Sequence, residues 1–500
     1  MKKIILTTLN SRFTHTSIAL RYLYANLQEL QQDAMIAEFS INDAVQSIAQ
    51  KLLQHKPQII GIGVYIWNVS QVYELIHIIK KVAPQTKIIL GGPEVSHEPF
   101  RVNLDAADFI IQGEGDEAFY ELCKKILSSS APKERIMKMS MPSLKNIALP
   151  YRYYTDDDIK NRYIYVEASR GCPFECEFCL SSMDERVRAF DLDTLLEEFE
   201  LLWQRGARNF KFIDRTFNLN IKTANRLLDF FLAKPTPYFA HFEVVPDHFP
   251  ESLKAKMKLF GDGALQLEIG IQTLNPEIAA NISRPLQLDK IKENIRFLEN
   301  ETHAHIHLDL IVGLPGETLE SFGKNLDELV SLSSCEIQIG ILKKLSGTTI
   351  NRHDIEHGMV YSDIPPYDVL QTSKLSFEEI GVMKRFSRFW DLTYNSGNFK
   401  ESVKLIWQEG SVFENFYDFG IWMYTQTDAT WQISLQRLGE LLFTYLCEVK
   451  KLPPEFVAKT MLQDMMKLQG RVVPPYLKPY TDDTHAPNKK GTSGFNKRQQ

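Results

Sequence analysis

The segment YIYVEASRGCPFECEFC, residues 163–179, joins a strand-like run to three cysteines spaced C-x-x-x-C-x-x-C. Cys172, Cys176 and Cys179 are half of the six cysteines in a chain of 500 residues. A disulfide needs two thiols, and a structural zinc site takes four ligands. Neither kind of site uses three thiols alone, so the role of these cysteines has to be inferred from the sequence around them.

The pattern around this segment is a series of strands separated by amphipathic helical segments. After residues 163–169, strand-like runs occur at residues 210–214, 238–245, 265–271, 305–313 and 336–342. Six such units predict a partial or full β/α barrel of the TIM type over residues 161–350. In a barrel the loops at the carboxyl ends of the strands carry the chemistry, and the three cysteines follow the first strand directly.

A second α/β series precedes the barrel. Strands are predicted at residues 2–9, 35–39, 58–65, 87–90 and 108–111, with helices at residues 17–30, 43–54, 69–82 and 116–127. Parallel strands need such helical crossovers, so residues 1–130 are predicted to form a doubly wound parallel sheet. We expect a linker at residues 131–160, a helical domain at residues 366–475, and a polar, disordered tail at residues 481–500.

Composition narrows the class of protein. The net charge of −6 gives no reason to expect nucleic-acid binding. The N-terminus does not resemble a signal peptide, and no run of about 18 apolar residues is present, so we expect a soluble cytoplasmic protein. Cys123, Cys335 and Cys447 lie in helix or strand patterns and are predicted to be buried.

The clustered thiols have two metal-based interpretations. Three thiolates can hold three irons of a [4Fe–4S] cluster and leave the fourth iron open. Zinc is the alternative, but its fourth ligand would have to come from elsewhere in the chain.

At this point the sequence resembles the radical S-adenosylmethionine (SAM) superfamily. The family motif has an aromatic residue before its last cysteine, as Phe178 is here, and later strand ends resemble further family segments. The resemblance implies that the three cysteines hold a [4Fe–4S] cluster whose open iron binds SAM. Reductive cleavage would then give a 5′-deoxyadenosyl radical, with the electron coming from a flavodoxin- or ferredoxin-type donor. The implied SAM-binding residues are Phe178, Asp214, Arg215, Glu243, Gln272, Gly313, Leu314, Pro315 and Gly316.

Before such a barrel, the N-terminal domain resembles the flavodoxin-like cobalamin-binding domain of B12-dependent radical SAM proteins. This class includes the anaerobic magnesium-protoporphyrin IX monomethyl ester cyclase, and the resemblance rests on residues 91–96 and 113–117. The implied cobalamin-binding residues are Thr14, His15, Tyr65, Trp67, Gly91, Gly92, Pro93, Glu94, Gly113, Glu114 and Gly115.

The residues of this domain also have other interpretations. The common D-x-H-x-x-G motif is altered, because Phe13 and Ile18 stand in place of its Asp and Gly. His15 then fits a helix-start position as well as a cobalt ligand. On spacing alone, the glycines fit tight βα turns, and Tyr65 and Trp67 fit core aromatics.

The combined resemblance implies methylation of an unactivated carbon in a small molecule. Radical cyclisation or oxidative rearrangement is the alternative reaction, and a corrinoid- or redox-sensing binding module is the alternative without turnover. A second cysteine trio is absent, which argues against the tRNA-modifying methylthiotransferases. Finally, His303, His305 and His307 alternate along one strand. With Asp309 they could bind a metal, but an inward polar face that contacts substrate or cofactor is the favoured interpretation.

Overall fold

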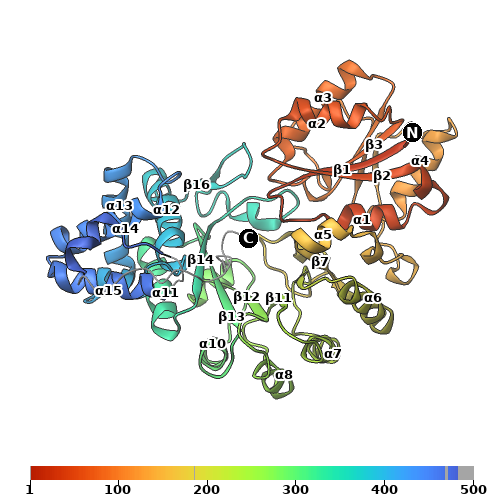
Figure 1. Ribbon diagram of the computed structural model, residues 1–500. Coiled ribbons are helices and arrows are strands. Elements are labelled where there is room, and N and C mark those ends of the chain that lie inside the picture. The colour runs from red at the N-terminus through yellow and green to blue at the C-terminus, as the bar shows by residue number, and fades with distance from the viewer. Residues whose placement is uncertain (1, 185, 468–470, 482–500) are drawn as a thin grey trace.

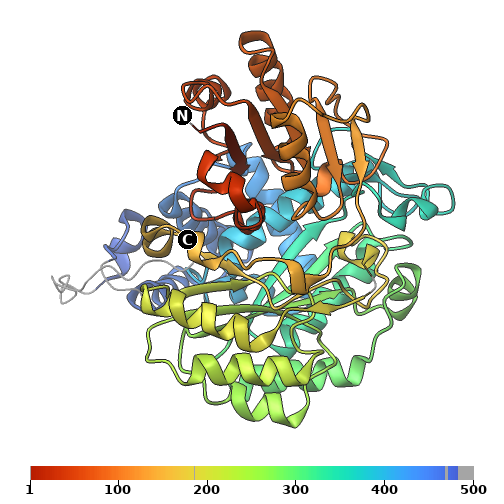
Figure 2. The ribbon, with the colours of Figure 1, turned by 90° about the vertical axis from the view of Figure 1, so that its right-hand side faces the viewer.

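The computed structural model describes residues 2–184, 186–467 and 471–481. The tail predicted at residues 481–500 lies outside them except for its first residue. An N-terminal sheet domain and a group of C-terminal helices flank a central β/α partial barrel (Figure 1). In the view turned by 90°, the N-terminal domain sits above the barrel strands (Figure 2).

The N-terminal sheet is fully parallel and doubly wound, as predicted. Its strand order is β2-β1-β3-β4-β5-β6, so the order reverses between β1 and β3, where open α/β sheets bind ligands. Apolar side chains alternate along each strand and form a separate core on each face. The elements are β1 (Ile4–Asn10), α1 (Ile18–Ala25), β2 (Ala34–Ser40), α2 (Val45–Leu53), β3 (Ile59–Gly63), α3 (Val69–Val82), β4 (Lys87–Gly91), β5 (Phe109–Gln112), α4 (Ala118–Leu127) and β6 (Ile136–Lys138).

The predicted linker at residues 131–160 is more structured than its composition indicates. Strand β6 pairs in parallel with β5, and α5 (Asp156–Asn161) begins with a capping box at Thr155. Tyr151 and Tyr154 are fully buried against the barrel. The prediction missed these contacts because β6 has only three residues at a sheet edge and the segment is polar, so its partners lie far away in sequence.

The barrel sheet is a six-stranded parallel partial barrel in the order β14-β13-β12-β11-β10-β7. Its strands are β7 (Ile164–Val166), β10 (Asn209–Phe212), β11 (Phe239–Val244), β12 (Leu265–Gln272), β13 (His305–Val312) and β14 (Glu336–Ile341). Its helices are α6 (Leu192–Gln204), α7 (Ile221–Leu232), α8 (Glu251–Met257), α9 (Pro276–Asn281), α10 (Leu288–Glu301) and α11 (Leu319–Leu332). Each strand confirms a predicted one.

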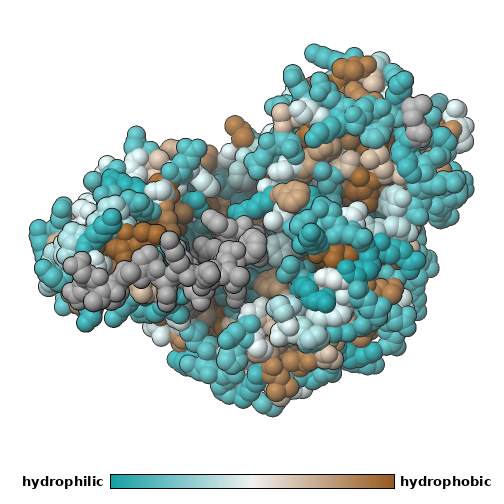
Figure 3. Space-filling model, viewed as in Figure 1, coloured by the Kyte–Doolittle hydropathy of each residue, from teal (hydrophilic) through white to brown (hydrophobic). Residues whose placement is uncertain are grey.

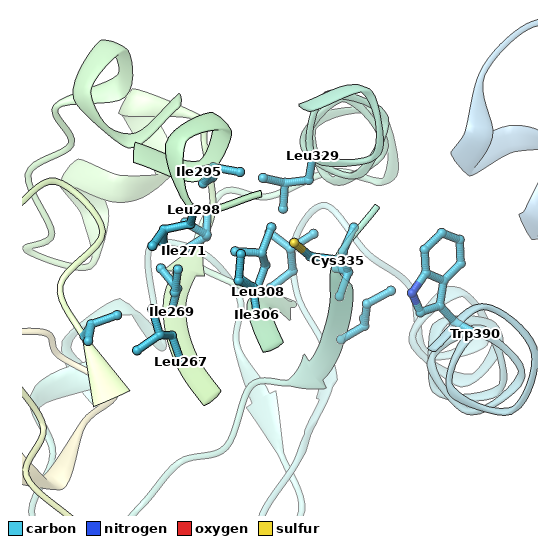
Figure 4. Packing of buried hydrophobic residues seen from close by; sticks show 14 of the residues in the cluster. Leu267, Ile269, Ile271, Ile295, Leu298, Ile306, Leu308, Leu329, Cys335 and Trp390 are labelled. Atoms are coloured by element: carbon cyan, nitrogen blue, oxygen red, sulfur yellow. The ribbon is translucent and has the colours of Figure 1, made fainter. Parts of the chain in front are cut away.

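The two faces of this sheet differ sharply in polarity. Along β12 and β13, buried aliphatic residues alternate with half-buried ones. The aliphatic side chains of Leu267, Ile269, Ile306 and Leu308 point toward α10 and α11 (Figure 4). The other face carries Gln266, Glu268, His305, His307 and Asp309. A TIM barrel fills this interior with branched apolar residues, so a polar lumen indicates a space for polar ligands.

The C-terminal helices extend the barrel core. They are α12 (Phe377–Trp390), α13 (Val412–Thr427), α14 (Leu435–Thr444) and α15 (Pro454–Met466), preceded by a short hairpin of β15 (Val360–Tyr361) and β16 (Val369–Gln371). Trp390 is fully buried in the same apolar cluster as the barrel helices, on the α12 side of β14 (Figure 4). On the surface, hydrophobic residues form separate patches among hydrophilic ones (Figure 3). None of the described helices is both long and apolar enough to cross a bilayer.

Candidate functional site

The three clustered cysteines face one cavity at the carboxyl ends of the barrel strands. We call this space, of about 270 Å³, the cysteine cavity; Cys172, Cys176 and Cys179 all line it. The loop turns at Gly171, whose φ is +93° and where an added Cβ would lie 2.3 Å from the Arg186 carbonyl oxygen. Only glycine fits there. Burial raises the pKa of the Cys172 thiol, as it does for the other buried thiols Cys123 and Cys335.

Two charged side chains that the sequence did not single out hold this loop. Arg284 Nη1 lies 3.3 Å from Cys176 Sγ, and its Nη2 donates to the Gly270 carbonyl. Glu177 is buried, accepts a 2.6 Å hydrogen bond from Ser283 Oγ, and lies 2.9 Å from His353 Nε2. These partners come from distant segments, so no local sequence signal could have revealed them.

The residues predicted to bind SAM fall into two groups. Phe178, Arg215, Glu243 and Gln272 line the cysteine cavity. Arg215 Nη1 donates to both Glu243 oxygens, at 2.7 and 2.9 Å.

The second group lies outside the lining of the cysteine cavity. Asp214 accepts hydrogen bonds from Ala168 N at 2.9 Å and Ser169 Oγ at 2.6 Å, and burial raises its pKa to about 6. It therefore braces the strand that leads into the cysteines. The turn Gly313, Leu314, Pro315 and Gly316 follows β13, and the Glu317 carboxyl accepts a 2.7 Å hydrogen bond from Gly313 N.

Two carboxyls of the barrel interior, Asp309 and Glu268, also line the cysteine cavity. Burial raises the pKa of Asp309 well above its usual value, and the nearby Glu268 and Glu243 charges raise it further. Burial also opposes ionisation of Glu268, but its 2.9 Å contact with His241 Nε2 and the charges of His241 and Lys211 lower its pKa overall. The two carboxyls of this cavity therefore have pKa values shifted in opposite directions.

A second cavity lies between the N-terminal sheet and the barrel. This space of about 310 Å³, the glycine cavity, is lined by seven of the residues predicted to bind cobalamin: Tyr65, Gly91, Gly92, Pro93, Gly113, Glu114 and Gly115. The barrel contributes Glu167, Arg170 and Ile213. An added Cβ at Gly91 would meet nothing closer than 3.8 Å, so a side chain there would project into open space. The cavity is mostly apolar and lies at the carboxyl ends of the strands, which fits part of a large planar cofactor.

Four predicted cobalamin residues lie outside this lining. Trp67 stacks on Tyr65 with ring centroids 4.5 Å apart, and the Glu94 carboxyl accepts a hydrogen bond from Tyr367. Thr14 and His15 lie against β7 instead. The Thr14 carbonyl accepts a 2.9 Å hydrogen bond from Tyr163 N, and His15 Nδ1 contacts the Tyr165 hydroxyl.

His15 therefore lies at the barrel edge and outside the lining of the glycine cavity. It lines a third space, the lumen cavity of about 860 Å³, together with His241, His305, His307 and Glu336. Burial and the neighbouring Lys211 and Arg12 charges lower the pKa of His15 to about 4. The loop bends this way because Asn10 Nδ2 donates to the His15 carbonyl and Thr16 Oγ1 donates to the Tyr163 carbonyl.

One arginine links the cysteine loop to the glycine cavity. Arg170, two residues before Cys172, contacts Glu114 at 2.8 Å, Asp116 at 2.9 Å and Glu167 at 3.0 Å. Burial raises the pKa of Glu167 to about 7, although Arg170 opposes the shift. Arg170 therefore links the position of the cysteine loop to that of the loop that carries Glu114 and Asp116.

Family models match both halves of this arrangement. Residues 4–123 match the B12 binding domain, and residues 166–329 match the radical SAM superfamily. The chain is a B12-binding-domain-containing radical SAM protein. The cofactors predicted for it, cobalamin, SAM and a [4Fe–4S] cluster, are those of this class. Residues 355–498 of this radical SAM protein match a family described only as a protein of unknown function, DUF4080.

Individual relatives agree with this assignment. The radical SAM protein is 25% identical to an uncharacterized methyltransferase of Pyrococcus horikoshii, over 74% of this chain and 86% of the relative. It is 24% identical to the cobalamin-dependent radical SAM methyltransferase TokK of Streptomyces tokunonensis, over 60% of this chain and only 49% of TokK. The fold resembles that of the cobalamin-dependent SAM radical enzyme OxsB with aqua-cobalamin bound, with a TM-score of 0.60, 12% identity, and coverage of 93% and 80% of the two chains.

Proposed function

We propose that this protein is a cobalamin-dependent radical SAM methyltransferase that acts on an unactivated carbon of a small molecule. The observation that carries the proposal is the pairing of two cavities. Three thiols line one and glycines line the other, and Arg170, two residues before Cys172, contacts Glu114 and Asp116 of the glycine cavity. When bound, the cluster supplies the electron that cleaves SAM, and cobalamin supplies the methyl group.

The chain's own residues have distinct parts in this proposal. Cys172, Cys176 and Cys179 hold the cluster, and Phe178, Arg215, Glu243 and Gln272 border SAM. Asp214 and the turn at residues 313–316 hold the ends of their strands in place through hydrogen bonds. The Arg215–Glu243 pair offers both charges to the zwitterionic methionine end of SAM, and Asp309, whose pKa burial raises, lines the same cavity.

We further infer that residues 1–130 bind cobalamin, that residues 161–350 bind the cluster and SAM, and that residues 366–475 cover the barrel side. The reductant that such an enzyme needs would be of flavodoxin or ferredoxin type. Cytoplasmic location remains a prediction from the sequence.

The test measures cofactors and turnover together. Protein made anaerobically with hydroxocobalamin should contain about four irons, matching sulfide and one corrinoid per chain, and should form 5′-deoxyadenosine from SAM and reductant. Cys176→Ala should lose iron and SAM cleavage, whereas Cys123→Ala, a buried thiol of the N-terminal core, should retain both.

Three other outcomes would contradict this proposed function. Cluster and SAM cleavage without corrinoid would overturn methyl transfer through cobalt. Corrinoid and cluster without SAM cleavage would indicate a sensing module. Zinc without sulfide would indicate a structural protein.

A further inference from the structure

The lumen cavity contains a cluster of metal-ligating side chains that the proposed function does not use. His305 Nε2 lies 3.1 Å from Glu336 Oε1, and His307 Nε2 lies 3.2 Å from Glu336 Oε2. One ligand atom from each residue can be chosen so that all three lie within 4.8 Å of one another. We propose that His305, His307 and Glu336 form a binding site for a divalent transition-metal ion, zinc being the first candidate.

Strand geometry places these three residues together. His305 and His307 are two positions apart on β13, so both side chains point into the lumen. Glu336 pairs directly with His307 in the parallel register of β13 and β14. The third histidine of the alternation, His303, precedes the strand and contacts Asp262 on the surface. Asp309 lines the cysteine cavity instead.

The surroundings orient the ligands as metal sites require. Gln338 Nε2 lies 2.6 Å from His307 Nδ1 and donates to it as placed. With this amide turned over, its oxygen would accept the Nδ1–H and leave Nε2 directed toward Glu336. Such a partner fixes the tautomer of a ligating histidine. The three side chains are 13–31% exposed, which keeps them accessible from the cavity but restricts their motion.

The charges around the cavity do not prevent cation binding. Four cations among the described residues line the cavity. Arg388 contacts Asp391 at 3.1 Å, Lys384 contacts Asp368 at 2.9 Å, and Lys211 lies close enough to Glu268 to lower its pKa. The fourth, Arg12, lies near His15. Glu268 adds negative charge on the next strand, opposite His307. Two imidazoles and a carboxylate form a ligand set that suits zinc and other first-row divalent ions.

Three protein ligands leave a coordination position open toward a cavity of about 860 Å³. Glu268 lines both this cavity and the cysteine cavity. A metal here could hold an oxygen or nitrogen donor of a molecule that reaches toward the SAM site. This role rests on the proposed function, whereas metal binding itself does not.

The experiment measures zinc on the anaerobic holoenzyme after chelator treatment and back-titration. We expect about one zinc per chain beyond the iron, with only nitrogen and oxygen neighbours in zinc-edge X-ray absorption. His305→Ala and Glu336→Gln should each weaken zinc binding by about 100-fold or more, and Gln338→Leu by about 10- to 100-fold. Normal iron and corrinoid contents confirm that each variant folds.

His303→Ala is the matched control, because it removes a histidine of the same alternation that lies 62% exposed on the surface. It should leave zinc binding unchanged. No retained zinc, sulfur neighbours around the zinc, or equal loss in His303→Ala and His305→Ala would each overturn the proposal. SAM cleavage measured in parallel separates failure of this site from failure of the proposed function.

Discussion

Arg284 shows how one side chain outside the motif can tune the cluster. Its guanidinium lies 3.3 Å from Cys176 Sγ. A positive charge and a hydrogen bond to a ligating sulfur favour the reduced, more negative cluster. Arg284→Gln should therefore lower the cluster reduction potential by tens of millivolts, measured by redox titration with electron paramagnetic resonance. Arg296→Gln, an identical charge change at an exposed position of α10, is the control. An unchanged potential in Arg284→Gln would contradict the assignment.

Glu317 provides a pH-dependent test of the turn after β13. Burial raises its pKa from 4.5 to about 8, despite its hydrogen bond from Gly313 N, so the folded chain holds this proton more tightly than the unfolded chain. Stability therefore falls as pH rises between these two values, by at most about 1.4 kcal/mol per pH unit. Glu317→Gln should remove this slope.

The measurement for Glu317 is thermal unfolding under anaerobic conditions from about pH 5.5 to about pH 8. The Tm of Glu317→Gln should exceed that of the wild type increasingly toward high pH. Glu320→Gln alters an exposed carboxylate on the next turn and should follow the wild type. Parallel Tm curves for Glu317→Gln and wild type would show that Glu317 does not titrate in this range.

At the residue scale, the sequence predicted the groups with local signals and missed those without. The three cysteines and Phe178 share one short loop, so their spacing was enough to bring them to one cavity. Arg284 reaches the same cavity from the segment between α9 and α10 and was missed, whereas Asp309 had been predicted as part of an inward polar face. His15 could be placed in the correct loop, but its direction depends on hydrogen bonds that involve Asn10 at the end of β1 and Tyr163 just before β7, and no pattern in the loop encodes them.

Among the elements, the apolar face of β13 gives a direct stability test. Leu308 is fully buried and packs toward α10 and α11 (Figure 4). Leu308→Ala should reduce the free energy of unfolding by about 2–5 kcal/mol, because a cavity remains between sheet and helices. Gln266→Ala on the lumen face of the neighbouring strand should cost far less. Denaturant unfolding of both variants measures the difference, and equal losses would contradict the two-faced sheet.

The carboxyl end of β4 tests the glycine cavity. Gly91→Leu would project into the space proposed for cobalamin without meeting protein atoms at its Cβ. Corrinoid affinity should fall by about tenfold or more, while iron content stays normal. Gly261→Leu adds the same side chain at an exposed glycine with nothing within 4 Å, so corrinoid affinity should be unchanged. Unaltered binding in Gly91→Leu would place cobalamin elsewhere.

Element prediction succeeded where the strand residues are buried, even in the three-residue β7, and failed at β6, whose residues are partly exposed. All six barrel strands were predicted because each combines a buried face with helical segments on both sides. Strand β6 was missed because three residues at a sheet edge leave almost no hydrophobic pattern. Its formation depends on the exposed edge of β5, which is a property of the sheet.

For the whole molecule, the relative placement of the domains could not be predicted, because the contacts that set it join residues more than 100 positions apart. Arg21 of α1 contacts Glu38 of β2 and Asp158 of α5, each at 2.8 Å. Arg162 contacts the same two carboxylates, at 3.2 and 3.3 Å. The side chains are at most 10% exposed, so the four charges compensate one another with little help from water.

This ion cluster holds the N-terminal domain on the barrel, and removing one member should loosen the whole molecule. Arg21→Met leaves Glu38 and Asp158 with only Arg162, and breaking a buried pair in this way costs about 3–5 kcal/mol. We expect thermal unfolding to separate into two transitions, with faster proteolysis between residues 128 and 160. The exposed pair Arg437–Glu440 gives the control, because Arg437→Met should leave a single transition. Since the glycine cavity is built from both domains, Arg21→Met should also weaken corrinoid binding while iron content persists. An unfolding curve and a corrinoid affinity identical to those of the wild type would show that Arg170 and the Tyr367–Glu94 contact suffice to hold the domains together.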